Sequence, residues 1–296
     1  MNEEEIQNDL LRYVPQVQYE LIPIKNLVSN QDYQRNLSEH HVQRAAKHFD
    51  IYQINPVKVS RRDGINYVFN GQHTIEIVAL VSGSRETPVW CMIYDDLIYT
   101  READIFANQM KYTKSLAPYE IFMANIEAGN DTQLLIRDLV ESYGLFVSGK
   151  SQPGGICAVA TLERIYERYG FHILDRTIRL IVGTWEGVPQ SFSANMLSGV
   201  ARLVYCFGDT LKDSMFKDKL SRISVKEIAR TARDRRNGSL GVSEALLLIY
   251  NKKNKKSALQ FSKLYFSKGN KPASPIETEI EDESYKGNCS VDTKTT

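Results

Sequence analysis

The stretch Ile65-Asn66-Tyr67-Val68-Phe69-Asn70-Gly71-Gln72-His73-Thr74-Ile75 decides the predicted fold. It begins as an apolar, β-rich run and continues directly into a glycine turn, after which apolar residues recur at helical spacing. A glycine at such a turn allows the backbone to approach a ligand closely. The helix that follows presents free N–H groups and the positive end of its dipole. The turn is therefore a candidate phosphate site.

The segments on either side predict a small sheet. Residues 57–60 and 65–69 flank Asp63-Gly64, a pair that favours a tight hairpin turn. Residues 17–22 alternate between apolar and polar, and residues 88–94 form another apolar run, so both are predicted strands. Ser38 is positioned to cap a helix that starts beside it, and a second helix begins near Ile75.

Beyond residue 98 the pattern is helical. Helices are predicted at 100–112, 117–128, 131–143, 157–169, 173–185, 193–207, 211–220, 224–235, 241–250 and 258–266. From Ser267 onward, few apolar residues occur among many Pro, Ser, Glu and Lys residues. The predicted class is therefore α+β: a small α/β module at 1–98, a mostly helical domain at 99–266 and a disordered tail at 267–296.

The N-terminal block resembles the core of the ParB/sulfiredoxin superfamily. Its progression is Asn55-Pro56-Val57-Lys58-Val59, then Asp63-Gly64-Ile65-Asn66-Tyr67-Val68-Phe69-Asn70-Gly71-Gln72-His73-Thr74 and a helix to Ala79. Tyr33-Gln34-Arg35 matches the family's segment before its first helix. With its long helical half, the whole chain is similar to ParB-like proteins of phages and mobile elements. This resemblance implies a nucleotide or phosphate site at the glycine turn.

The turn departs from the family at two positions. Gln72 stands where sulfiredoxins carry the reactive cysteine, so sulfiredoxin chemistry is not expected. Thr74 replaces the arginine with which ParB proteins hold nucleotide phosphates. Arg35, Arg61 or Arg62 are candidates to supply that charge from neighbouring loops. Free-serine kinases, which share the module, have a related Gly-His-His-Arg turn.

The resemblance and the turn together give the expected site. The predicted phosphate- or nucleotide-binding residues are Asn70, Gly71, Gln72, His73, Thr74 and Arg35, and the expected ligand is a nucleoside triphosphate with Mg²⁺. His73 is the candidate catalytic residue because imidazole titrates near neutrality. It could equally cap the loop or pack on Tyr67, and Asn70 could cap the helix. No metal site is predicted, since His40, His41 and His48 lack partners at ligand spacing and are interpreted as surface or helix-end residues.

Charge is distributed unevenly along the chain. The net charge is +1, yet residues 212–268 hold fifteen Lys/Arg against five Asp/Glu. Such clustering is typical of nucleic-acid binding. The predicted nucleic-acid contacts are Arg230, Arg233, Arg235, Arg236, Lys252, Lys253, Lys255 and Lys256. Residues 224–230 are also typical of the opening helix of a helix-turn-helix. The alternative is a solvated basic face balanced by the acidic run at 277–283.

The remaining features concern the cellular compartment. The four cysteines are far apart and form no Cys-x-x-Cys pair, which favours reduced, mostly buried thiols. The acidic start Met1-Asn2-Glu3-Glu4-Glu5 lacks the pattern of a signal peptide, and no apolar run approaches the ~20 residues that a bilayer requires. A cytoplasmic location without a membrane partner is predicted.

Three functions are compatible with these patterns. The leading hypothesis is a ParB-like, DNA-associated protein of a phage or mobile element, with DNA and a second copy of the chain as expected partners. The first alternative is an enzyme on the same module, either a small-molecule kinase or a nuclease. The second is a non-catalytic module that docks a protein partner.

Overall fold

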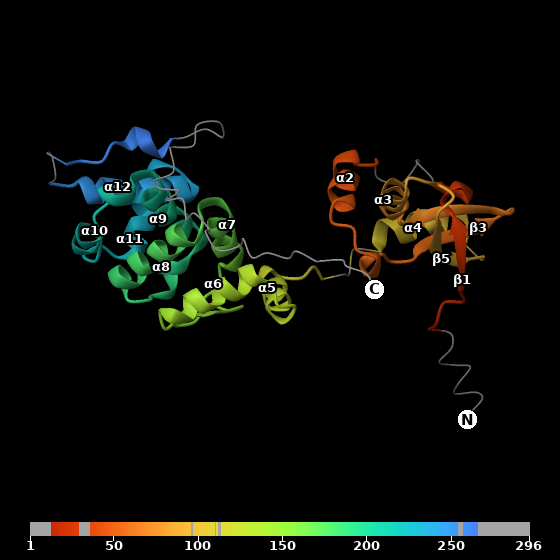
Figure 1. The fold of residues 1–296 in the computed structure, drawn as a ribbon, viewed down its shortest axis with the longest axis horizontal. Helices are drawn as coiled ribbons and strands as arrows, with labels where there is room; N and C mark the ends of the chain where they lie inside the picture. Colours follow the sequence, from red (N-terminus) through yellow and green to blue (C-terminus); the bar gives the residue numbers. More distant parts are fainter. Residues whose placement is uncertain are drawn as a thin grey trace, which may run out of the picture. The chain divides into compact units, whose positions relative to one another are not determined.

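The chain forms two compact units, Met1–Ser115 and Leu116–Thr296 (Figure 1). The structure is a computed structural model that describes residues 13–29, 36–95, 97–109, 111, 114–253 and 257–265. The first unit contains a mixed sheet and the second consists mainly of helices, so the predicted α+β class is confirmed. Three predicted features, Arg35, Lys255-Lys256 and the tail at 267–296, lie outside the described residues.

The sheet of the first unit has five strands in the order β1-β5-β3-β4-β2. Their bounds are β1 Gln18–Pro23, β2 Leu27–Ser29, β3 Val57–Arg62, β4 Ile65–Asn70 and β5 Pro88–Tyr94. β1 and β5 are antiparallel, as are β3 and β4, whereas β3–β5 and β2–β4 are parallel. The predicted hairpin is confirmed, with Asp63 and Gly64 both at positive φ. Only β2 was not predicted, because three residues are too few to show periodicity.

One face of the sheet is covered by helix α3, which spans Gln72–Ser82. Its buried Ile75 and the half-buried Val78 and Ala79 pack against apolar side chains of the strands. The strand residues of this core are Ile22, Leu27, Val57, Val59, Val68, Val89, Cys91 and Ile93. Helix α2, Glu39–Ala46, packs beside α3, and Ser38 caps it as predicted by accepting a hydrogen bond from the backbone N–H of His41.

Helix α4, Tyr99–Asn108, belongs to the first unit, although the sequence placed it in the helical domain. The buried carboxylate of Glu102 explains this, since it forms an ion pair of 2.7 Å with the guanidinium of Arg62 on β3. The boundary between the units therefore falls after Ser115 instead of after residue 98.

The second unit contains eight α-helices among the described residues. They are α5 Pro118–Glu127, α6 Asp131–Ser142, α7 Val159–Tyr169, α8 Phe171–Trp185, α9 Ala194–Phe207, α10 Asp213–Leu220, α11 Val225–Arg235 and α12 Gly238–Asn251. Short elements join them, namely β6 Phe146–Val147, β7 Gly155–Ile156 and the 3₁₀ turns η3 Pro189–Phe192 and η4 Gly208–Thr210. The helix predicted at 258–266 is wrong, because this stretch forms only the 3₁₀ turn η5, Phe261–Leu264.

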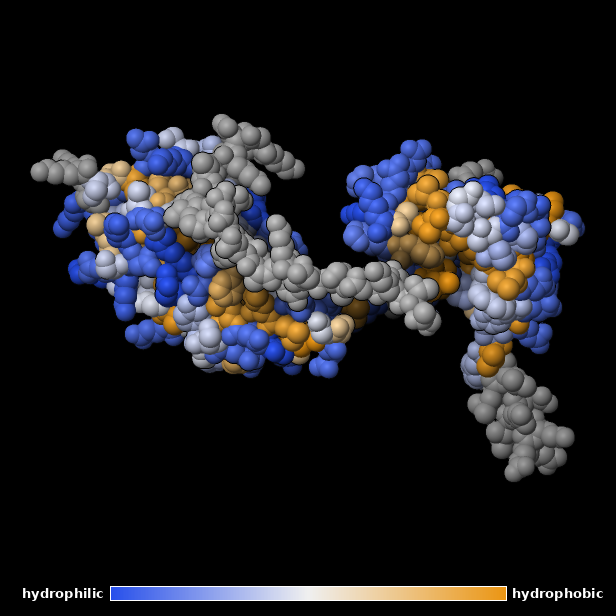
Figure 2. Space-filling view, in the orientation of Figure 1, coloured by the Kyte–Doolittle hydropathy of each residue, from blue (hydrophilic) through white to orange (hydrophobic). Residues whose placement is uncertain are grey.

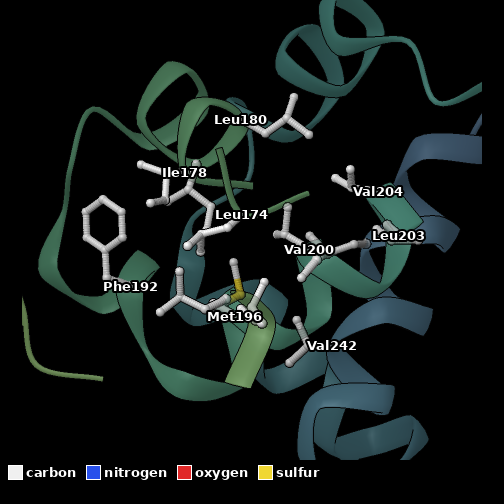
Figure 3. Packing of buried hydrophobic residues seen from close by; sticks show 14 of the residues in the cluster. Leu174, Ile178, Leu180, Phe192, Met196, Val200, Leu203, Val204 and Val242 are labelled. Carbon is white, nitrogen blue, oxygen red and sulfur yellow. The ribbon is translucent and has the colours of Figure 1, made fainter. Parts of the chain in front are cut away.

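Helices α8, α9 and α12 build the centre of this unit, where apolar side chains interlock (Figure 3). Close packing depends on glycine at one contact in particular. A Cβ on Gly241 of α12 would lie 1.8 Å from the carbonyl oxygen of Arg236, so only glycine permits the tight corner between α11 and α12.

The outer surface of the helical unit is mostly hydrophilic on the face shown in Figure 2, with an apolar patch over α5 and α6. No helix in the described part of the chain is both long and apolar enough to cross a membrane. Cys91 and Cys206 are buried free thiols, and burial raises the pKa of each to about 11, whereas Cys157 is exposed.

Candidate phosphate pocket and basic surface

The turn between β4 and α3 requires glycine. Gly71 is the N-cap of α3 and adopts φ +108°, a conformation that L side chains rarely take. A Cβ here would lie 3.1 Å from Cγ1 and 3.2 Å from Cα of Val57, tighter than nine in ten real Cβ contacts. Since Gly71 has no side chain, it cannot cap the first N–H groups of the helix that it starts.

The turn opens into a pocket of about 510 Å³. Its lining residues are Asn36, Ser38, His41, Asn70, Gly71, Gln72, His73, Thr74, Phe106 and Gln109. The pocket therefore brings together the predicted stretch Asn70–Thr74, the start of α2 and the end of α4. Two helix N-termini meet here, and the positive ends of both dipoles favour a bound anion. None of the described lining residues is acidic.

Amide side chains supply further hydrogen-bonding groups. Asn70 donates from Nδ2 to Oε1 of Gln109 at 2.6 Å, which ties the end of β4 to the end of α4. Gln72 is only 8% exposed and lines the pocket, and its amide has no hydrogen-bond partner among the described residues. Its amide atoms are not among the described buried polar atoms that lack a partner, so they are accessible from the pocket. A polar ligand in the pocket can therefore hydrogen-bond to them.

The two histidines of the pocket lie against each other. The ring of His73 is 5.3 Å from that of His41, edge to face. Nε2 of His73 accepts a hydrogen bond of 3.4 Å from the backbone N–H of Ser38, so this nitrogen is not a proton donor in this arrangement. His73 thus joins the starts of α2 and α3. His41 is an exposed residue in the first turn of α2, as predicted, and it also lines the pocket.

Neither Arg61 nor Arg62 reaches the pocket, contrary to the sequence-based hypothesis. The guanidinium of Arg61 donates two hydrogen bonds, of 2.9 and 2.7 Å, to the carboxylate of Glu20. These hydrogen bonds lower the pKa of Glu20 and raise that of Arg61. Arg62 is held by Glu102 on the side of the sheet where α4 packs. Both charges are already compensated within the fold.

Sequence reasoning missed the pocket residues that lie outside the turn, namely Asn36, Ser38, His41, Phe106 and Gln109, although it predicted Ser38 as a helix cap. They come from segments some 30 residues before and after it, and no local pattern marks them as neighbours. The described residues also contain no group of His, Cys, Asp and Glu suited to a metal ion. The pocket offers no described carboxylate to Mg²⁺, so a metal ion would be held by ligand phosphates and water.

The predicted basic residues of the second unit fall into two groups. Arg230 and Arg233 of α11 are exposed and have no ion-pair partner among the described residues. Arg235 and Arg236, by contrast, lie 3.3 and 3.8 Å from the buried carboxylate of Glu244. Arg235 and Arg236 are therefore paired with a carboxylate within the fold, as Arg61 and Arg62 are. The exposed residues Lys252 and Lys253 directly follow α12.

The helix-turn-helix interpretation of this region is wrong. After α11 the chain turns at Arg236-Asn237 into α12, which would be the recognition helix. A recognition helix must expose one face to enter the major groove. Residues 241–247 of α12 are all buried, as is Tyr250, because this helix forms the centre of the unit.

These features define the class as an α+β protein with a polar, acid-free pocket on a small sheet module and a separate helical unit. The chain belongs to the family described as a family of unknown function, DUF6551, whose model matches residues 28–263. No curated protein matches it. Among solved structures it is similar to the C-terminally truncated chromosome-partitioning protein ParB from Caulobacter crescentus, crystallised with CTP-γ-S. The identity is 13%, the TM-score is 0.32, and the match covers 79% of this chain and 98% of that one. A likeness of this size does not transfer a ligand or a site.

Proposed function

We propose that this protein is a ParB-like, DNA-associated protein whose N-terminal pocket binds a phosphate-bearing ligand, with a nucleoside triphosphate as the favoured class. One observation carries the pocket half of the proposal. The N-termini of α2 and α3 converge on a cavity that no described acidic side chain enters. Such an arrangement attracts anions even without lysine or arginine.

The residues of the turn have complementary roles in this proposal. The backbone N–H groups at the start of α3 donate to phosphate oxygens, and Gly71 allows the ligand to come close. Thr74 and the amide of Gln72 add side-chain hydrogen bonds. His41 and His73 line the same cavity and bring imidazole nitrogens to it. A Mg²⁺ ion would arrive with the triphosphate, held by its oxygens.

The DNA half of the proposal rests on α11. Arg230 and Arg233 present uncompensated charge to solvent, and neutralising phosphates in this way gives binding that weakens with salt. Lys252 and Lys253, which directly follow α12, are also exposed and are included in the proposed contacts. Origin in a phage or mobile element, a cytoplasmic location and homodimerisation belong to the proposal through the sequence resemblance.

The pocket is tested by thermal shift with ATP, CTP, GTP and UTP, each with and without Mg²⁺. A ligand that binds the native state raises the melting temperature by mass action. The matched variants are Gln72→Leu, which removes a pocket amide, and Gln53→Leu, which removes an exposed amide on the short turn Ile51–Gln53. The proposal expects a shift with at least one nucleotide, reduced in Gln72→Leu and kept in Gln53→Leu. No shift with any of the four would refute the pocket half.

The DNA half is tested separately by fluorescence anisotropy with labelled duplex and single-stranded DNA at two salt concentrations. The double variant Arg230→Ala/Arg233→Ala is compared with Arg222→Ala, an exposed arginine that pairs with Asp218 on the preceding helix. Loss of two phosphate contacts should weaken binding and reduce the salt slope by about two. Wild-type protein that binds no DNA at low salt would refute this half and leave the pocket untouched.

A further inference from the structure

A groove of about 460 Å³ crosses the helical unit between α11, η3 and the start of α9. Its apolar lining consists of Met196, Val225, Ala229, Ala232 and Val242. Met196 and Val242 are both labelled in Figure 3, among the packed residues of the core. Because Ala229 and Ala232 have small side chains, the groove stays open along α11.

The rim of this groove is positively charged. Lys226, Arg233 and Arg236 line it, and none of its described lining residues is acidic. Lys226 and Arg233 have no ion-pair partner in the part of the chain that the structure describes. The groove also contains the N-terminus of α9, a 14-residue helix whose N-cap Ser193 makes no side-chain cap hydrogen bond. Apolar floor, cationic rim and helix dipole together fit an acidic, partly apolar segment.

The chain itself contains such a segment. Residues 276–283 read Ile276-Glu277-Thr278-Glu279-Ile280-Glu281-Asp282-Glu283, with five acidic side chains and two isoleucines four residues apart. The segment therefore matches the groove in both charge and apolar content.

The segment is also within reach. Tyr265, the last described residue, donates a hydrogen bond of 2.7 Å to Glu244, and its ring lies 5.8 Å from the guanidinium of Arg236 on the groove rim. The eleven residues from Tyr265 to Ile276 can span up to roughly 36 Å. The ten-residue rise of α11 from Lys226 to Arg236 is only about 15 Å. The tether can therefore deliver the segment to any part of the groove.

We propose that Ile276–Glu283 docks in this groove of its own chain, with the isoleucines on the apolar floor and the acidic side chains toward Lys226, Arg233 and Arg236. The docked segment compensates the charge of α11. It therefore competes with any external polyanion for this face of the helix. The docking itself is independent of the proposed DNA binding, since it needs only the groove and the segment.

Zero-length carbodiimide cross-linking of the full chain tests the contact, because it joins a lysine amine to a carboxylate only at direct approach. Lys226 should couple to the acidic segment at least about fivefold more often than Lys253, an exposed lysine outside the groove. The reason is that docking raises the local concentration of the acidic segment beside Lys226. Lys226→Arg keeps the rim charge and should abolish that cross-link alone. Equal coupling to Lys226 and Lys253 would overturn the proposal.

Two further readouts use the same full-length protein. Replacing Glu277, Glu279, Glu281 and Glu283 by Gln and Asp282 by Asn should shift the methyl resonance of Met196 and leave that of Met123, on α5, unchanged. Mixing isotopically heavy and light protein shows whether each cross-link joins one copy or two. An unchanged Met196 resonance, or cross-links only between heavy and light copies, would contradict docking within the chain.

Discussion

Replacing Gly71 by alanine tests the geometry on which the pocket depends. The φ of +108° is strained for any L side chain, which costs about 1–3 kcal/mol. The new Cβ would also press on Val57 at 3.1 Å, including its backbone Cα at 3.2 Å, and overpacking of this kind costs about 1–3 kcal/mol. Together these effects should lower the local free energy of unfolding by about 2–6 kcal/mol.

Gly64 provides the matched control in the same module. It too has a positive φ, of +75°, but a Cβ there meets nothing within 4 Å. Gly64→Ala should therefore cost only about 1–2 kcal/mol, the backbone share of the effect. The comparison separates backbone strain from the contact with Val57.

Hydrogen exchange of the amides in β3 and β4 measures the difference, because it reports the opening of the first unit separately from the helical unit. If Gly71→Ala destabilises the first unit by about 2 kcal/mol more than Gly64→Ala does, its amides should exchange roughly thirtyfold faster. Equal exchange rates in the two variants would refute the argument that close packing on Val57 makes glycine necessary at the turn.

Three other predictions concern the rest of the fold. Glu102→Ala removes one partner of a buried ion pair and should destabilise the first unit by about 3 kcal/mol, measured by urea unfolding. Asp104→Ala breaks an exposed pair on the same helix and should cost under about 1 kcal/mol; similar losses would contradict this account of α4. Burial and a hydrogen bond to Asp175 raise the pKa of Tyr143 from 10.0 to about 12, so this hydroxyl should contribute stability that is lost as pH rises through that interval. Tyr143→Phe should remove this loss of stability at alkaline pH. If the free energy of unfolding of the variant depends on alkaline pH as that of the wild type does, the assignment to Tyr143 is contradicted. A thiol reagent on native protein should modify Cys157 rapidly and Cys91 or Cys206 slowly; rapid loss of either buried thiol would contradict their burial.

Local patterns carried much of the fold prediction. The strand at 65–69, the Asp-Gly hairpin and the glycine turn depend on neighbouring residues, and the structure reproduces all three. The helices of the second unit also follow from apolar spacing. The stretch at 258–266 differs because the side chain of Asn251 bonds both the N–H and the C=O of Leu259, which removes those groups from a helical pattern.

The pocket was only half predictable, for a physical reason. Asn70–Thr74 are contiguous and carry a recognisable turn chemistry. The opposite wall comes from α2 and α4, which the sheet brings together through contacts such as Arg62–Glu102 that no local pattern reveals. Adjacent residues of a strand also point to opposite faces, so the different partners of Arg61 and Arg62 could not be assigned from their shared position in the sequence.

The central claim is that the paired starts of α2 and α3 bind a phosphate-bearing ligand. Titration of isotope-labelled full-length protein with each nucleoside triphosphate and Mg²⁺, followed by amide NMR shifts, tests it most directly. The account predicts saturable shifts concentrated at residues 71–74 and 38–41. Gln72→Leu should weaken the affinity obtained from this titration about tenfold, because the ligand loses one buried hydrogen bond. Shifts confined to the helical unit, or no shift with any triphosphate, would contradict it.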